Sequence, residues 1–336
     1  MIRGALAIVA FAVSAHLLAC SAAQAGTWTS LAPAQVARQE VAVAAANGKL
    51  YLIGGIGQDR AILDSVEEYD PATNTWRFVA PLPQPLHHAA AATVGDAIYV
   101  IGGYRTLAFD PTAAVYRYAN DRWTRVADLP RARGALAAAA IDGRIYAVGG
   151  VPGTRELTMY DPATDRWTTL APMPTAREHL AAAAHGGSLY AIGGRVNGNV
   201  SALERYDPAT NVWTSLPPMP TARAGIAAAV LRDRIHVFGG EGNPATATGV
   251  FAENEVYDVA TNRWLRDTAM QTPRHGIGAA TLGDRIHLPA GSPLQGFGTT
   301  NVHDALSATV GRRRATSVSS RAQSRDLPRI HHAHRE

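Results

Sequence analysis

The stretch Thr175–Gly194, TAREHLAAAAHGGSLYAIGG, decides how the chain folds. Taken alone, its four consecutive alanines favour a helix, because alanine has the highest intrinsic helix propensity. The stretch ends in a glycine pair, however, and alanine-rich runs followed by glycine pairs recur along the chain. The period of that recurrence outweighs the local propensity.

Glycine pairs close apolar runs at intervals of 44 to 51 residues. They are Gly54-Gly55, Gly102-Gly103, Gly149-Gly150, Gly193-Gly194 and Gly239-Gly240, with Ala290-Gly291 as a degenerate sixth. Tryptophans recur in step at Trp28, Trp76, Trp123, Trp167, Trp213 and Trp264. Five tyrosines each precede a tryptophan by seven residues, namely Tyr69, Tyr116, Tyr160, Tyr206 and Tyr257. The sequence therefore contains six copies of one unit.

Each unit contains two hairpin signals. Between Tyr and Trp most copies read D-P-A-T-x-x-W, as in Asp70–Trp76, where proline and aspartate favour a turn. Before each glycine pair, an alanine-rich run and an alternating run flank a turn such as Asp142-Gly143. Each unit is thus predicted to form four short antiparallel strands.

Glycine pairs, tyrosine and tryptophan at these offsets resemble the kelch repeat over residues 27–305. The resemblance implies an all-β, six-bladed β-propeller with four antiparallel strands per blade. The alanine runs are then innermost strands, where the blades crowd together, and the Tyr and Trp side chains fill the space between blades. We expect residues 180–184 to be extended.

The last copy is the least regular. It has Ala290 in place of glycine, Pro289 in its second strand, a weak third strand near Asn301–Asp304, and no tryptophan. Trp28 supplies the missing residue, so the segment Thr27–Ser30 is predicted to pair into the sixth blade and close the ring.

The N-terminal residues predict export. An apolar stretch, Ala5–Ala19, follows Arg3, and Ala23-Gln24-Ala25 is a cleavage signal, so we expect residues 1–25 to be a signal peptide and the protein to be periplasmic or secreted. Leu17–Cys20 resembles a lipobox, which leaves an outer-membrane lipoprotein anchored at Cys20 as the alternative. No transmembrane span is expected. Cys20 is the single cysteine of the chain, so disulfides and thiolate sites are not expected.

The formal charge of +4 comes from the C-terminal segment. Residues 311–336 hold seven arginines against Asp326 and Glu336, which leaves the rest of the chain near neutral. We expect this segment to be a disordered basic tail, because it has few apolar residues. Its tract His331–His334 has the composition of a metal-binding segment. Nucleic-acid binding is not expected, and we expect a monomer.

An arginine recurs 17 positions before the second residue of each glycine pair. The set is Arg38, Arg133, Arg177, Arg223 and Arg274, with Leu86 in the remaining copy. A constant offset in a repeat means a constant position in space, so these arginines form a ring at one mouth of the central channel. One interpretation is structural, with each arginine bonded to loop carbonyls or an acidic neighbour. The other is a binding face whose forked donors match an anion.

Titratable residues lie near these six positions, at Glu40, His87, His88, Glu178, His179 and His275. A single histidine at a strand start is usually a satisfied loop residue, so only convergence of several would indicate a site. Together with the arginines, Glu178, His179 and His275 are the candidate binding residues. No catalytic residue, metal ligand or cofactor is expected.

Together with the predicted signal peptide, the resemblance implies an exported binding module that recognises a protein segment or an anionic glycan at the arginine-lined face. The alternative is a sugar-acid isomerase resembling the periplasmic kelch proteins that interconvert sialic acid anomers, in which Arg177, Glu178 and His179 supply the residue types. A copper oxidase similar to galactose oxidase is not favoured, because its cofactor needs a cysteine. The loop from Glu241 to Phe251 is the longest insertion and a candidate partner contact.

Overall fold

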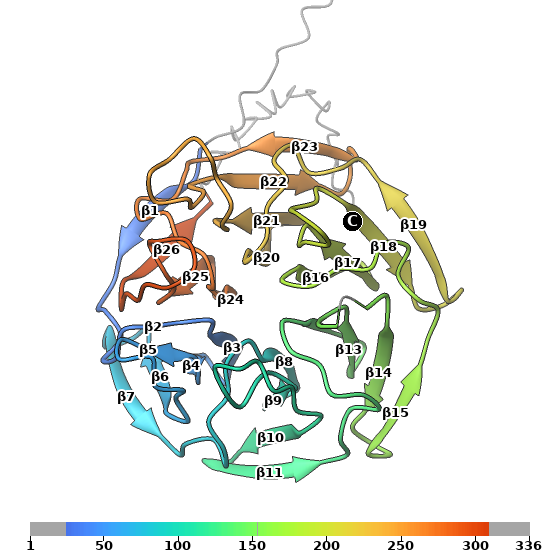
Figure 1. The fold of residues 1–336 in the computed structure, drawn as a ribbon, viewed down its shortest axis with the longest axis horizontal. Helices are drawn as coiled ribbons and strands as arrows, with labels where there is room; N and C mark the ends of the chain where they lie inside the picture. The colour runs from blue at the N-terminus through green and yellow to red at the C-terminus, as the bar shows by residue number, and fades with distance from the viewer. Residues whose placement is uncertain (1–24, 153, 309–336) are drawn as a thin grey trace, which may run out of the picture.

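The computed structural model describes residues 25–152 and 154–308, and there the chain is a six-bladed propeller (Figure 1). Each blade is a four-stranded antiparallel sheet, and the six sheets stand around a central axis with the innermost strand of each blade nearest to it. The expected basic tail, and all of the expected signal peptide except Ala25, lie outside the described residues. The expected all-β propeller is confirmed.

The strands of each blade follow in order from the axis outward. Blade 1 consists of β3 (Ala42–Ala46), β4 (Lys49–Ile53), β6 (Val66–Asp70) and β7 (Thr75–Val79), and blade 2 of β8 (Ala90–Val94), β9 (Ala97–Ile101), β10 (Val115–Ala119) and β11 (Arg122–Val126). Blade 3 consists of β12 (Ala137–Ile141), β13 (Arg144–Val148), β14 (Leu157–Asp161) and β15 (Arg166–Thr169), and blade 4 of β16 (Ala181–His185), β17 (Ser188–Ile192), β18 (Leu203–Asp207) and β19 (Val212–Leu216). Blade 5 consists of β20 (Ala227–Leu231), β21 (Arg234–Phe238), β22 (Asn254–Asp258) and β23 (Arg263–Arg266), and blade 6 of β24 (Ala280–Leu282), β25 (Arg285–Pro289), β26 (His303–Ser307) and β1 (Thr27–Ser30).

The alanine runs form the innermost strands, as expected. Ala181–His185 is β16, paired residue by residue with β17. The inner strands of neighbouring blades pack against one another around the axis, where larger side chains would not fit. Tertiary crowding therefore overrides the helix propensity of alanine.

The tryptophans connect neighbouring blades. Each indole Nε1–H donates to a backbone carbonyl of the segment that leads out of the preceding blade, as Trp76 does to Ala32 O at 2.9 Å and Trp213 to Ala171 O at 2.8 Å. In blades 1 to 5 the tyrosine opposite the tryptophan donates to a turn side chain, for example Tyr206 Oη to Asn211 Oδ1 at 2.7 Å. In blade 2 the outer hairpin is shorter, so Tyr118 lies opposite Trp123 and the expected Tyr116 lies two residues earlier.

The N-terminal strand closes the propeller. β1 pairs antiparallel with β26, with Trp28 opposite Leu306. The Trp28 indole donates to Thr268 O at 3.1 Å, and Gly26 N–H donates to Asp267 at 2.6 Å. The predicted closure by Thr27–Ser30 is therefore confirmed.

The sixth blade is complete despite its irregular sequence. Its third strand, β26, begins at His303, slightly later than expected, and extends to Ser307. Ala290 adopts a φ of 61°, the left-handed conformation that glycine supplies in the other blades. Pro289 is the last residue of β25, where it lies opposite His303 of β26.

Short ladders at the channel mouth position the site. β2 (Arg38–Gln39) pairs with β5 (Ile56–Gly57), and the equivalent residues of other blades form single bridges such as Glu178 with Arg195 and His275 with Ser292. Each bridge joins the start of an inner strand to the residue that follows its glycine pair.

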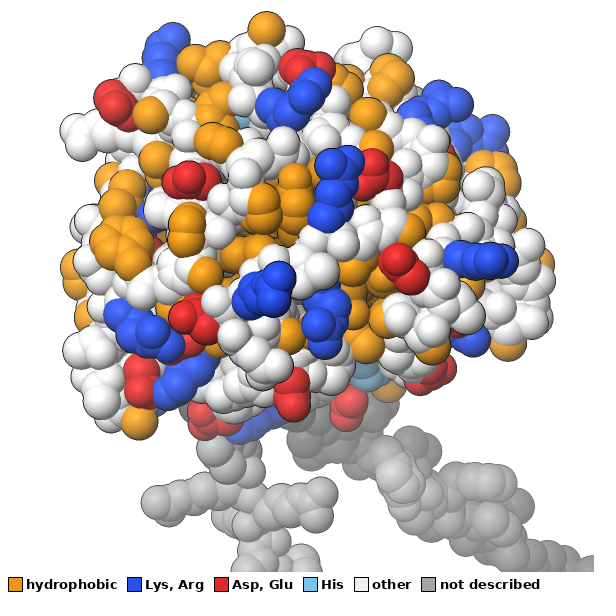
Figure 2. Space-filling view, turned by 90° about the horizontal axis from the view of Figure 1, so that it is seen from below, with side chains coloured by type: hydrophobic (Ala, Val, Ile, Leu, Met, Phe, Trp, Pro, Cys, Tyr) orange, Lys and Arg blue, Asp and Glu red, His pale blue; other side chains and the backbone are white. Residues whose placement is uncertain are grey.

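The surface carries both signs of charge. Figure 2 shows one edge of the disc, where Lys and Arg side chains alternate with Asp and Glu and no large area has one sign. The described part of the chain contains no helix with the length and apolarity of a membrane span.

Candidate functional site

The five recurring arginines are buried, with no side-chain surface exposed to solvent. Each guanidinium group bonds backbone carbonyls within its own blade, as Arg177 does to Ala191 O at 3.0 Å and Ala202 O at 3.1 Å. Four of them also pair with a buried acid, namely Arg38 with Glu67 at 2.6 Å, Arg177 with Glu204 at 2.9 Å, Arg223 with Glu255 at 2.5 Å and Arg274 with Asp304 at 3.2 Å.

The prediction that these arginines receive an anion at the mouth is therefore wrong, and the structural interpretation describes them. Arg133 differs, because its closest polar side chain is the Thr158 hydroxyl at 2.8 Å. The repeat itself contains the signal that was missed. The paired residue always lies two positions before the residue opposite the tryptophan, and in blade 2, where Leu86 replaces the arginine, that position holds Tyr116.

A closed ring of backbone hydrogen bonds surrounds the axis two residues after each arginine position. Each N–H of this ring donates to the carbonyl of the equivalent residue in the preceding blade, at 2.8 to 3.0 Å, and the six members are Glu40, His88, Ala135, His179, Gly225 and Gly276. All six have φ between 51° and 65°. This conformation is uncommon outside glycine and is associated with functional sites.

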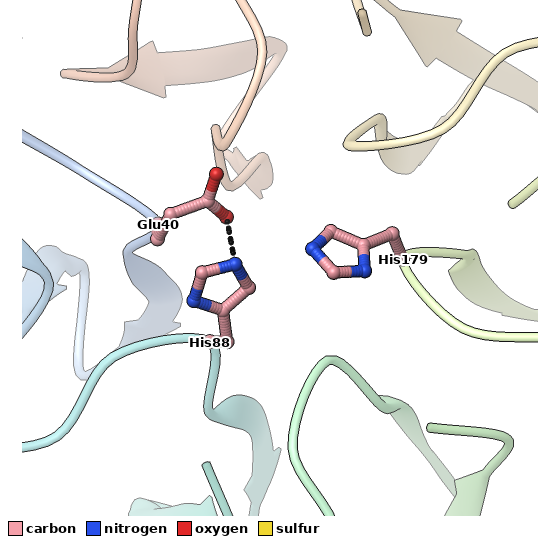
Figure 3. Close-up of side chains that lie close together, drawn as sticks. All are labelled: Glu40, His88 and His179. Carbon is pink, nitrogen blue, oxygen red and sulfur yellow. Dashed lines mark ion pairs between the residues drawn. The ribbon is translucent and has the colours of Figure 1, made fainter. Parts of the chain in front are cut away.

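The ring carries three functional side chains and three small ones. Glu40, His88 and His179 converge at the axis from blades 1, 2 and 4 (Figure 3). Ala135, Gly225 and Gly276 occupy the other three positions of the ring and line the same cavity without a functional group. The convergence that would distinguish a site from isolated loop histidines is therefore present.

Two cavities meet at these three side chains. A small one of about 100 Å³ lies within the channel, lined by the ring and the residues that follow it. A larger one of about 380 Å³ forms the mouth, and its rim includes Leu107, Phe109 and Phe297. Leu107 is 45% exposed and Phe109 is 52% exposed. The mouth thus combines an apolar rim with a polar floor.

Arg195 organises one side of the floor. Its Nε donates to Glu178 at 2.6 Å, its Nη1 to Glu241 at 2.7 Å, and its Nη2 lies 3.1 Å from His179 Nε2. Glu178 also contacts His179 Nδ1. Because the guanidinium group only donates, His179 Nε2 accepts and His179 Nδ1–H donates to the Glu178 carboxylate. Burial, with Arg195 nearby, holds the pKa of His179 well below its usual range.

Glu40 and two histidines form a directed chain on the other side. His87 Nε2 lies 3.0 Å from the Thr106 carbonyl, which only accepts, so this nitrogen carries the proton. His87 Nδ1 then accepts from His88 Nδ1–H at 2.6 Å, which leaves a lone pair on His88 Nε2. That lone pair faces Glu40 Oε2 at 3.1 Å, so Glu40 holds the shared proton.

The pKa of Glu40 agrees with this assignment. Burial, and then the negative charge of Glu241, raise the pKa of Glu40 to about 8. Burial holds the pKa of His88 well below its usual range. His275 lies between the two carboxylates, with its Nδ1 3.5 Å from Glu40 and 3.6 Å from Glu241. Burial lowers the pKa of His275 although Glu241 opposes this.

Of the candidate binding residues, Glu178, His179 and His275 meet at this floor, and the five arginines do not. Sequence analysis missed Arg195 as a site residue and identified Glu241 only as the start of a loop. The signal for both is their offset, since each directly follows a glycine pair. The other blades have Ile56, Tyr104, Val151 and Ser292 there, so these two are the charged members of the set.

Comparison with known proteins gives kelch-repeat matches. The KLHDC2/KLHL20/DRC7 Kelch-repeats domain family matches residues 14–194, and the Kelch motif matches residues 176–220. Kelch-like protein 35 of Mus musculus is 38% identical over 95 residues, covering 28% of this chain and 17% of the relative. The F-box/kelch-repeat protein At1g67480 of Arabidopsis thaliana is 42% identical over 77 residues, covering 23% of this chain and 20% of the relative.

A solved structure has the same fold. The structure of YjhT aligns with a TM-score of 0.68 at 16% identity, over 81% of this chain and 95% of that one. The chain spans only about a fifth of the length of these two curated relatives.

Proposed function

This chain belongs to the kelch-repeat family, and on that premise we propose that it is an exported binding module whose propeller mouth receives a short protein segment. The observation that carries the proposal is the cavity of about 380 Å³, with apolar side chains at its rim and buried titratable groups at its floor. Binding sites typically combine apolar walls with a few polar groups that fix orientation. The apolar stretch before Ala23-Gln24-Ala25 supports export, with anchoring at Cys20 as the alternative.

The charge of the mouth favours a protein segment over an anionic glycan. Two arginines line the mouth: Arg195 is already paired with Glu178 and Glu241, and Arg60 lies over the Phe297 ring. The arginines that would have received an anion are buried in the blades. A segment with an aromatic or aliphatic side chain fits better, because Phe109 and Leu107 offer it exposed apolar surface.

A random peptide display library selected on the full chain tests this proposal. Enriched peptides are expected to share an apolar residue and to bind Phe109→Glu at least about tenfold more weakly than the wild type, which corresponds to about 1.4 kcal/mol. Phe78→Glu is the matched control, because Phe78 is also half exposed but lies on β7, an outer strand. The absence of enrichment, or equal binding by Phe109→Glu and the wild type, would contradict the proposal.

Sugar-acid isomerisation is the second candidate, and one observation favours it. Glu40 shares a proton with His88 and has a pKa of about 8, so it exchanges protons near neutral pH, as a general acid or base must. Mutarotation of sialic acid followed by NMR tests it. This candidate requires acceleration that Glu40→Gln removes, and no acceleration by the wild type at high protein concentration would eliminate it.

A further inference from the structure

Glu40, His88 and His179 each place a potential metal ligand at the same point on the propeller axis. Their donor atoms all lie within 4.8 Å of one another, and the three side chains point toward a common space from three different blades (Figure 3). The sequence separates these residues widely, so their meeting is a property of the closed ring.

The backbone fixes the three ligands in advance. Each of them belongs to the hydrogen-bonded ring, and each holds a φ between 51° and 54°. All three side chains are largely withdrawn from solvent, with 10% of Glu40, 6% of His88 and 8% of His179 exposed. A binding group that is already held in place loses little conformational entropy when it binds.

Outer hydrogen bonds orient both imidazoles in the way that metal ligation needs. His179 Nδ1 is bonded to the Glu178 carboxylate, and His88 Nδ1 is bonded to His87, which is anchored in turn on the Thr106 carbonyl. Both histidines therefore direct Nε2 inward with a lone pair. An outer carboxylate or carbonyl behind the ligating histidine is the usual arrangement of protein metal sites.

The spacing and the charge suit a divalent ion. His88 Nε2 and Glu40 Oε2 are 3.1 Å apart. Two ligands about 2.1 Å from a tetrahedral zinc ion lie about 3.4 Å from each other. Glu178 and Glu241 together outweigh the single positive charge of Arg195, and Glu40 becomes a carboxylate ligand when the ion displaces the proton that it holds in the metal-free protein.

We propose that Glu40, His88 and His179 bind one divalent transition-metal ion of the zinc class, with an open coordination position that faces the mouth cavity. Two imidazoles and one carboxylate select such ions over magnesium and calcium, which prefer oxygen ligands. His179 Nε2 then gives up its bond to Arg195, which stays attached to Glu178 and Glu241. The site stands independently of the proposed peptide binding.

Equilibrium dialysis of the full chain against Zn²⁺ tests the proposal. The tract His331–His334 could bind metal on its own, so the reference protein carries His331→Gln, His332→Gln and His334→Gln. This reference is expected to bind one Zn²⁺ per chain, with no competition from Mg²⁺ or Ca²⁺. Co²⁺ bound in place of zinc is expected to give the visible absorption of a four- or five-coordinate ion with nitrogen ligands.

Substitutions within the site identify the ligands. His88→Gln, His179→Gln and Glu40→Gln are each expected to weaken Zn²⁺ binding by more than about tenfold, and His87→Gln, which removes an outer partner, by about 10- to 100-fold. His185→Gln is the matched control, because His185 lies at the far end of β16. Circular dichroism in EDTA identifies variants that fail to fold.

The results separate this proposal from peptide binding. Leu107→Glu, which also alters the apolar rim, is expected to bind Zn²⁺ like the reference protein, whereas Phe109 packs against His87 and His88 and is unsuitable for this comparison. The metal site would be ruled out if the reference bound no stoichiometric Zn²⁺, or if folded His88→Gln and His179→Gln variants kept the reference affinity.

Discussion

The protonation of Glu40 depends on several charged groups that line the mouth of the propeller. Its carboxyl group contacts His88 and His275 and is repelled by Glu241, while Arg195 partly offsets that repulsion. Burial in this setting raises its pKa from 4.5 to about 8. In the folded protein Glu40 therefore keeps its proton across a pH range in which the unfolded chain has lost it.

This difference predicts the pH dependence of stability in metal-free protein. Between about pH 4.5 and pH 8 the folded state binds more protons at Glu40, so this residue makes the free energy of unfolding fall as pH rises. Glu40→Gln keeps a donor for His88 but does not titrate. The wild type is expected to lose at least about 1.4 kcal/mol more than this variant from about pH 5 to about pH 8. Denaturant unfolding in EDTA measures it, and parallel curves for the two proteins would contradict the assigned proton.

Replacement of a buried arginine leaves its hydrogen-bonding partner unpaired, and that partner differs from blade to blade. Removing Arg223 isolates Glu255, whose side chain has no exposed surface, whereas removing Arg133 mainly frees the Thr158 hydroxyl. Arg223→Met is expected to cost about 3–5 kcal/mol, because an unpaired buried charge remains. Arg133→Met is expected to lower the free energy of unfolding by clearly less. The double variant Arg223→Met/Glu255→Met is expected to regain much of the stability that Arg223→Met loses. Urea unfolding of the three variants tests this, and equal costs for the two single variants would show that the acid does not matter.

At the scale of the strand, the glycine pairs join neighbouring blades as well as ending β-strands. Gly239, at the end of β21, has a φ of 59°, and an added Cβ would lie 2.1 Å from Arg274 O in the next blade. Gly283 has a similar φ of 62° in the turn between β24 and β25, with nothing within 4 Å of an added Cβ. The two positions share a conformation and differ in packing.

Gly239→Ala and Gly283→Ala therefore separate backbone strain from steric exclusion. Each is expected to lose about 1–2 kcal/mol from the left-handed backbone, and Gly239→Ala to lose substantially more because blades 5 and 6 must move apart. Thermal unfolding of the pair measures the difference. Similar melting temperatures for the two variants would mean that the close approach is easily relaxed.

The strands could be predicted from the sequence because every copy repeats the same offsets. The direction in which a side chain points could not be predicted. The repeated position of Arg177 allows its side chain to point either into the channel or into the interior of the blade. The pairing of arginine with an acid in the third strand, and of Leu86 with Tyr116, contains that information but is visible only when the copies are aligned. The side chains that line the mouth were harder to predict, because Arg195 and Glu241 belong to different blades and occupy a position that is uncharged in the other copies.

At the scale of the whole molecule, stability depends on one closure between the two ends of the propeller. Trp28 repeats the contact that the other tryptophans make, with its indole bonded to Thr268 O and its ring 5.8 Å from Phe238. Trp28 differs from the other tryptophans in how its strand is connected to its blade. Trp264 lies on a strand continuous with its blade, whereas β1 joins blade 6 by hydrogen bonds and packing alone.

Trp28→Ala is thus expected to have a distinctive effect. Trp28→Ala should lose about 3–5 kcal/mol of unfolding free energy as a large buried side chain is removed, and Trp264→Ala less, because Trp264 is only partly buried. Trp28→Ala should also expose β26 to hydrogen exchange below the global unfolding transition. Hydrogen exchange by mass spectrometry over β26 and β22 measures this. If β26 and β22 exchanged at the same rate in both variants, blade 6 would not depend on its pairing with β1.

The ring of six backbone hydrogen bonds holds the shape of the site independently of which side chains the ring carries. Main-chain atoms make every bond of that ring, so a change of side chain there leaves the scaffold intact wherever space exists. Ala135 already adopts the required φ of 54° without a functional group, while at Gly276 an added Cβ would lie 2.6 Å from Glu40. Ala135 is accordingly a vacant position at which a single codon change could install a new reactive group, and propellers of this design can acquire new specificities without being rebuilt.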